Sequence, residues 1–129
     1  INLEHGIKNI DWSRDTDYVY LELYNTVDVL EEGDGYRVER TGLHRLEYID
    51  TIRHLFKVPV LHPANGSVRM LNLVEGNAAV VESVDKSFPP LEISYGETFI
   101  VPASVGDFVV RPAEANPDAF LVTIEASVR

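Results

Sequence analysis

Short, largely apolar runs alternate with polar turn segments from about residue 54 to the end of the chain. The runs are rich in β-branched and aromatic residues, and glycine, proline or asparagine separates them. The pattern predicts strands over residues 55–61, 68–75, 78–84, 91–94, 98–101, 108–111 and 120–125. Short strands at regular spacing favour a sandwich or a barrel, and the connections are too short for the helical crossovers of a parallel sheet. The sequence therefore predicts an all-β domain.

The first 45 residues are less regular. Residues 15–26 carry apolar side chains at both helical and alternating spacing, and we expect a short helix there. Strands are predicted over residues 27–33 and 36–40, on either side of a glycine turn. We expect residues 1–45 to form a mixed, partly helical N-terminal extension that packs on the barrel, and residues 46–129 to form the barrel domain.

The composition excludes several classes of function. The 129 residues suffice for one domain with a core, and 21 acidic against 11 basic side chains give a net charge of −10. Such a charge repels phosphate backbones and anionic lipids, so we expect neither nucleic acid nor a membrane as partner. The absence of cysteine excludes disulfides and thiolate sites. With no signal-peptide pattern, the cytoplasm is the predicted location, and the initial Ile1 in place of methionine suggests a fragment.

Two glycine segments narrow the fold. Residues 73–76, Leu-Val-Glu-Gly, end one predicted strand, and residues 96–102, Gly-Glu-Thr-Phe-Ile-Val-Pro, span another. Each glycine is expected to take a positive φ at the rim of a barrel, and Pro102 to end strand pairing. The two segments resemble the paired motifs of the cupin double-stranded β-helix. We therefore expect an all-β cupin, a jelly-roll barrel, with the N-terminal extension described above.

Metal-binding cupins carry two histidines and a glutamate before the first glycine, and a third histidine after the proline. The resemblance places these ligands near Pro63, Asn65 and Arg69, and near Phe108 or Val109. None of these side chains is a metal ligand. An inward Arg69 would repel a divalent cation and could hold an anionic group, although an outward Arg69 fits the pattern equally well. We expect no metal in this chain.

The histidines do not suggest a metal site either. His5, His44, His54 and His62 lie on different segments without the close spacing typical of ligand pairs. No serine lies in a nucleophile elbow, no glycine loop suits a phosphate, and no opposed pair of carboxylates is evident. The sequence therefore predicts no catalytic residue.

A basic stretch interrupts the acidic chain between residues 37 and 57. Its members are Arg37, Arg40, His44, Arg45, Arg53, His54 and Lys57. Such a stretch suits a phosphosugar-binding edge or a domain interface. Local neutralisation by Glu39, Glu47 and Asp50 is the alternative that we favour.

Four segments in order resemble a more specific family. Residues 1–14 (Ile-Asn-Leu-Glu-His-Gly-Ile-Lys-Asn-Ile-Asp-Trp-Ser-Arg), 48–56, 73–76 and 96–103 are similar to bacterial class I mannose-6-phosphate isomerases. In that family, the first segment follows the catalytic cupin domain and leads into a second cupin. The parent enzymes interconvert mannose 6-phosphate and fructose 6-phosphate by proton transfer at a zinc-supported site. The resemblance implies that the zinc ligands and the reacting arginine belong to the preceding domain, so no catalytic residue is carried over to this chain.

Three hypotheses of function follow. The first is a non-catalytic C-terminal cupin of a sugar-phosphate isomerase, with a structural role beside an upstream zinc-dependent domain and a contact between copies of the chain. The second is a metal-free module that binds a small molecule or carbohydrate, with Arg69, Asn72 and Thr123 lining the pocket. The third, an independent enzyme with an unrecognised site, has no constellation of residues in its favour.

Overall fold

The protein is described by a computed structural model that covers residues 2–24, 26–42, 46–115 and 119–129. Three helical segments open it, α1 (Leu3–Lys8), α2 (Thr16–Tyr18) and the π-helical η1 (Val19–Leu23), and a 3₁₀ turn, η2 (Ala103–Val105), lies near the end. The strands are β1 (Asp28–Gly33), β2 (Tyr36–Arg40), β3 (Ile49–Phe56), β4 (Val60–His62), β5 (Arg69–Glu75), β6 (Ala78–Ser83), β7 (Leu91–Ser94), β8 (Thr98–Val101), β9 (Phe108–Pro112) and β10 (Leu121–Val128).

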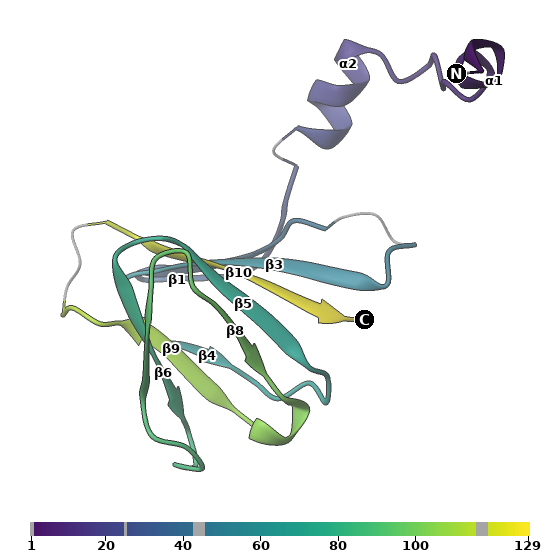
Figure 1. Cartoon of the computed structure of the whole chain (residues 1–129). Helices are drawn as coiled ribbons and strands as arrows, with labels where there is room; N and C mark the ends of the chain where they lie inside the picture. The colour runs from purple at the N-terminus through teal and green to yellow at the C-terminus, as the bar shows by residue number, and fades with distance from the viewer. Residues whose placement is uncertain (1, 25, 43–45, 116–118) are drawn as a thin grey trace.

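The strands form two antiparallel sheets that face each other (Figure 1). The first has six strands in the order β1-β2-β3-β10-β5-β8, and the second has four in the order β4-β9-β6-β7. Neighbours in both sheets are often distant in sequence, as where β10 lies between β3 and β5. The prediction of an all-β sandwich or barrel is confirmed.

Alternation along the strands places the core between the two sheets. Along β5, Arg69, Leu71 and Leu73 are buried while the residues between them are partly or fully exposed. This is the period of two that a strand with one buried face requires. The hydrophobic core consists of Phe56, Val60, Leu71, Leu73, Ala79, Val81, Ile93, Val101, Phe108, Val110 and Leu121.

One predicted strand is wrong in its bounds. Residues 55–61 were expected to form a single strand, but β3 ends at Phe56 and β4 begins at Val60. The structure also extends β3 back to Ile49, where the sequence predicted no strand. Two buried positions of β3 carry Asp50 and His54 in place of apolar side chains. The apolar alternation that reveals a half-buried strand is therefore missing from its first part.

The N-terminal extension divides into two parts. β1 and β2 continue the six-stranded sheet, because β2 pairs with β3. The expected helix is present as α2 and η1, and its first turn is capped by the Asp15 carboxylate, which accepts from Tyr18 N at 2.9 Å. However, α1, α2 and η1 contain no buried residue, and they stand away from the sheets in Figure 1.

The packing of this extension on the barrel stays a prediction. The division of the chain at residue 45 stays a prediction. Among the described residues, no helix has the length and apolar character needed to cross a membrane.

The two motif glycines adopt the backbone that the sequence predicts. Gly76 has a φ of 95° and Gly96 a φ of 79°, both in the left-handed region. At Gly76, a Cβ would also lie only 2.6 Å from Leu121 Cγ, so the turn requires glycine for space as well as for conformation.

Local neutralisation accounts for much of the basic stretch. The buried carboxylate of Glu39 contacts both Arg37 (2.7 Å) and Arg53. Arg40 Nε lies 3.0 Å from an Asp50 oxygen that also contacts Arg129. Two other members of the stretch, residues 44 and 45, lie outside the described part of the chain. The described arginines of the stretch are thus engaged with carboxylates of the same chain.

Candidate functional site

Five polar side chains from four strands meet inside the barrel, and we call them the interior cluster. They are His54 of β3, His62 of β4, Arg69 of β5, and Thr123 and Glu125 of β10. Each projects inward because it lies at a buried position of its strand's alternation. β4 belongs to the four-stranded sheet and the other three strands to the six-stranded sheet, so the cluster connects the two layers.

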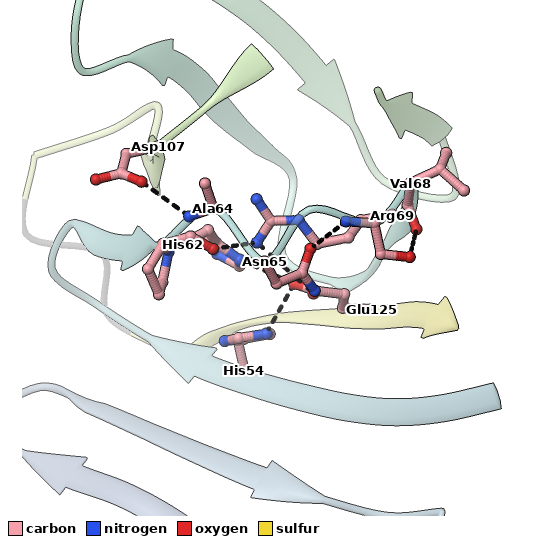
Figure 2. Close-up of polar contacts among 10 residues, drawn as sticks. His54, His62, Ala64, Asn65, Val68, Arg69, Asp107 and Glu125 are labelled. Carbon is pink, nitrogen blue, oxygen red and sulfur yellow. Dashed lines mark hydrogen bonds and ion pairs between the residues drawn. The ribbon is translucent and has the colours of Figure 1, made fainter. Parts of the chain in front are cut away.

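One carboxylate oxygen organises the two histidines. His62 Nδ1 lies 3.0 Å from Glu125 Oε2, and His54 Nε2 lies 3.3 Å from the same oxygen. The two imidazole rings are neighbours, with centroids 4.3 Å apart. Figure 2 shows both rings directed toward the end of the Glu125 side chain.

Arg69 engages the other oxygen of this carboxylate. Its Nη1 lies 3.9 Å from Glu125 Oε1 and donates a hydrogen bond to the Pro63 carbonyl at 3.1 Å. The guanidinium carbon lies 4.5 Å from the centre of the Phe108 ring, within the range of a cation–π interaction. His62 stacks on the same phenyl ring, with centroids 4.7 Å apart and planes inclined by 11°.

Burial and mutual contacts set the charge states of His62 and Glu125. Exposed fractions are 6% for His54, 1% for His62, 4% for Arg69, 0% for Thr123 and 5% for Glu125. Burial lowers the pKa of His62 to about 4, although the hydrogen bond with Glu125 opposes this shift. Burial would raise the pKa of Glu125, but its contacts with His54 and His62 outweigh burial and lower it to about 2. At neutral pH, His62 is therefore neutral and Glu125 is ionised.

Several polar atoms of the cluster lack a hydrogen-bond partner among the described residues. They are Nδ1 of His54, Nε2 of His62, Nε of Arg69 and Oγ1 of Thr123, whereas Nε2 of His54 has the 3.3 Å contact with Glu125. A buried donor or acceptor without a partner typically costs about 1–3 kcal/mol. Buried polar atoms in folded proteins normally have a hydrogen-bond partner. The unpartnered atoms in this barrel interior therefore point to a further occupant, such as an ion or a water molecule.

The donor set of the cluster fits a transition-metal ion. His54, His62 and Glu125 each offer one ligand atom, and these three atoms lie within 4.8 Å of one another. Neutral imidazole and ionised carboxylate are the forms that bind metal. Zinc, iron and related ions accept such a mixture of nitrogen and oxygen ligands. The guanidinium of Arg69 opposes a cation at this place, and Glu125 supplies the one carboxylate of the interior cluster as defined above.

The residues suggested as ligand-binding candidates do not share one surface. Arg69 and Thr123 lie in the interior cluster. Asn72 lies at an alternate position of β5, where its amide donates to Gly96 O (3.2 Å) and Thr98 Oγ1 (2.6 Å). Arg69 faces inward and contacts a carboxylate of its own chain. Whether these residues bind a ligand stays a prediction.

The expected ligand positions of metal-binding cupins hold other side chains, as the sequence indicates. Pro63 and Asn65 lie in the connection between β4 and β5, and the Asn65 side chain accepts from Ser67 N at 3.0 Å. Arg69 and Phe108 occupy the interior. A different set of donor atoms nevertheless converges there, since His54 and Glu125 lie outside those motif positions and His62 directly precedes Pro63.

The sequence reasoning missed this convergence. It treated the histidines as separate because they lack close spacing, whereas two of the four meet across the two sheets. One signal was available. His54 lies two residues before the apolar Phe56, and His62 lies two residues after the apolar Val60, so each histidine shares a strand face with a core residue. The expectation of a chain without metal stays a prediction.

Comparison with known proteins bears on the fold. No family model and no curated protein matches the sequence. The solved structure of an RmlC-like cupin from Shewanella frigidimarina matches with a TM-score of 0.55 and 19% identity, over 80% of this chain and 84% of that one. The chain has the cupin fold. The predicted fold class is thus confirmed.

Two further solved structures have a similar fold. The mannose 6-phosphate isomerase from Bacillus subtilis matches this cupin at a TM-score of 0.59 and 16% identity, over 80% of this chain and 28% of that one. The cupin chain therefore spans little more than a quarter of that enzyme. Iron(II) HppE matches at a TM-score of 0.60 and 9% identity, over 79% of this chain and 55% of that one. At such identities, each match shows the fold alone.

Proposed function

We propose that this chain is a non-catalytic cupin domain of a protein related to sugar-phosphate isomerases, with a structural role beside a zinc-dependent catalytic domain. The observation that carries the proposal is the closed interior. The cluster side chains are at most 6% exposed. In the described part of the chain, surface cavities lie at the Gly76 turn, beside Phe88 and beside Pro59, and no member of the interior cluster lines any of these. A sugar phosphate needs an open, concave site.

Two side chains make the interior unlike that of a catalytic cupin. Arg69 and Phe108 stand where the metal-binding members of the fold place a glutamate and a histidine, and they pack against each other. The Glu125 carboxylate is engaged by Arg69 and the two histidines. The carboxylate of the interior is therefore engaged by side chains of the same chain, which disfavours its use on a substrate.

The N-terminal helices support a contact with a neighbouring domain. The helices and the residues that flank them expose large apolar side chains, namely Leu3, Ile7, Ile10, Trp12, Val19, Tyr20, Leu21, Leu23 and Tyr24. Exposed apolar surface of this extent is characteristic of an interaction site. The ordered resemblance to class I mannose-6-phosphate isomerases makes an upstream catalytic cupin the partner that we propose, with a contact between copies of the chain as a further use of the same surface.

An isomerase assay tests the proposal. The purified chain is incubated with mannose 6-phosphate, with and without added zinc, and formation of fructose 6-phosphate is followed. We expect no turnover above background in either condition, while an active mannose-6-phosphate isomerase serves as the positive control. Zinc-dependent turnover by the chain alone would contradict the assignment.

A carbohydrate-binding module is the second candidate, and one observation favours it. A cavity at the Gly76 turn is lined by Glu75, Asn77 and Glu114 together with apolar side chains. Polar groups around an apolar floor suit a sugar, and two carboxylates favour a neutral sugar over a sugar phosphate. A thermal-shift screen distinguishes the candidates. A neutral sugar that raises the melting temperature would support the binding module.

A further inference from the structure

We propose that His54 Nε2, His62 Nδ1 and Glu125 Oε2 bind one divalent transition-metal ion, Zn²⁺, inside the barrel, where it joins the two sheets. Two of the three ligands, His54 and Glu125, lie outside the motif positions at which metal-binding cupins carry their ligands, and His62 directly precedes one of these positions, Pro63. The inference goes beyond the proposed structural role of the domain and does not depend on it.

The distances fit a tetrahedral ion. With Zn–N and Zn–O bonds of about 2.0–2.2 Å, neighbouring ligand atoms of a tetrahedron lie about 3.3–3.5 Å apart. Glu125 Oε2 lies 3.0 Å from His62 Nδ1 and 3.3 Å from His54 Nε2. All three ligand atoms lie within 4.8 Å of one another. The two imidazole nitrogens lie no more than 4.8 Å apart, so they would need to approach each other by at most about 1.5 Å for the three atoms to surround one ion.

The placement of the ligands makes the ion structural. His54 and Glu125 lie on β3 and β10 of the six-stranded sheet, and His62 lies on β4 of the four-stranded sheet. One ion would thus cross-link the two layers at the core. The ligands are at most 6% exposed, so the site lacks the open, accessible position that a catalytic metal keeps. Thr123, whose buried hydroxyl has no partner in the described chain, lies two residues before Glu125 and faces the same interior.

Arg69 is the feature that limits the affinity of the site. Its guanidinium contacts Glu125 Oε1, whereas both histidines contact Oε2. One carboxylate oxygen therefore faces the guanidinium, and the other faces the proposed ion. Part of the guanidinium charge is also engaged by the Phe108 ring and the Pro63 carbonyl. Nevertheless, a cation a few ångströms from a divalent ion weakens binding in a buried place. Removal of the charge at position 69 should therefore strengthen binding.

The test uses the untagged chain stripped of metal with EDTA. We expect calorimetry to show one Zn²⁺ bound per chain and the melting temperature to rise by about 5 °C or more at a hundredfold excess over Kd. Co²⁺ in the same site should give the visible absorption of a tetrahedral complex, whereas Mg²⁺, which prefers oxygen ligands, should not stabilise the chain. No binding of Zn²⁺ or Co²⁺ by the folded chain would overturn the inference.

Variants identify the ligands. His62→Gln and Glu125→Gln should weaken Zn²⁺ binding at least about tenfold, while His5→Gln, which changes an exposed histidine of α1, should leave it unchanged. Arg69→Met should bind more tightly than the wild type. Equal affinity of His62→Gln and the wild type would refute the assignment. Should a variant fail to fold, imidazole NMR of the wild type decides: Zn²⁺ must shift the signals of His54 and His62 and leave that of His5 in place.

Discussion

The contact between Arg69 and Phe108 makes a quantitative prediction. The guanidinium lies 4.5 Å from the centre of the ring, and the two residues are 4% and 0% exposed. Such a pair is worth about 0.5–1 kcal/mol at a surface and about 2 kcal/mol or more when water is excluded. We therefore expect the contact to stabilise the fold by about 1–2 kcal/mol.

A double-mutant cycle isolates this energy from the other effects of each change. Phe108→Leu keeps most of the apolar volume, and Arg69→Met keeps the length of the side chain without its charge. Each single variant also loses packing or hydrogen bonds, but the cycle cancels those losses and leaves the pairwise term. The free energy of unfolding of the four proteins is measured by urea titration in the presence of EDTA.

Phe56 provides the matched control. It is as fully buried as Phe108, but no ring contact with a cation is found for it among the described residues. The cycle of Phe56→Leu with Arg69→Met should give a coupling energy below about 0.5 kcal/mol, the usual limit for independent sites. A Phe108 coupling energy that is no larger than the Phe56 value would refute the cation–π reasoning.

Two further predictions concern acid sensitivity and the barrel rim. The pKa of His62 is lowered from 6.5 to about 4, so the unfolded chain takes up a proton between these values and the folded chain does not. The stability that this provides is complete above pH 6.5 and is lost as the pH falls toward 4; between pH 7 and 5 the loss is roughly 2 kcal/mol. Urea unfolding in EDTA should show this loss in the wild type and not in His62→Gln, and an equal pH dependence of the two would contradict the burial argument. At the rim, Gly96→Ala should cost about 1–2 kcal/mol for its positive φ alone. Gly76→Ala should cost about 1–3 kcal/mol more, because its Cβ meets Leu121 at 2.6 Å; equal melting temperatures of the two variants would contradict this difference.

The local pattern of the sequence determined most of the strands of this cupin. Runs of strand-forming residues between turn residues predict β5 and β6 almost to their bounds. In β5 the buried positions alternate, whereas in β6 three consecutive residues, 79–81, are buried. Gly76 and Gly96 mark their turns, since only glycine takes a positive φ without strain. The pattern failed at β3, where buried Asp50 and His54 replace the apolar residues that reveal a strand.

Only the tertiary structure decided the interior cluster. Alternation tells which residues share a face of one strand, but it does not tell which strands become neighbours. His54 and Glu125 lie 71 positions apart in sequence and meet because β10 pairs with β3, and His62 reaches them across the gap between the sheets. Strand order and register are properties of long-range pairing, set when the whole core is buried at once. A site whose residues come from several strands can therefore be recognised only when the strand order and register are known.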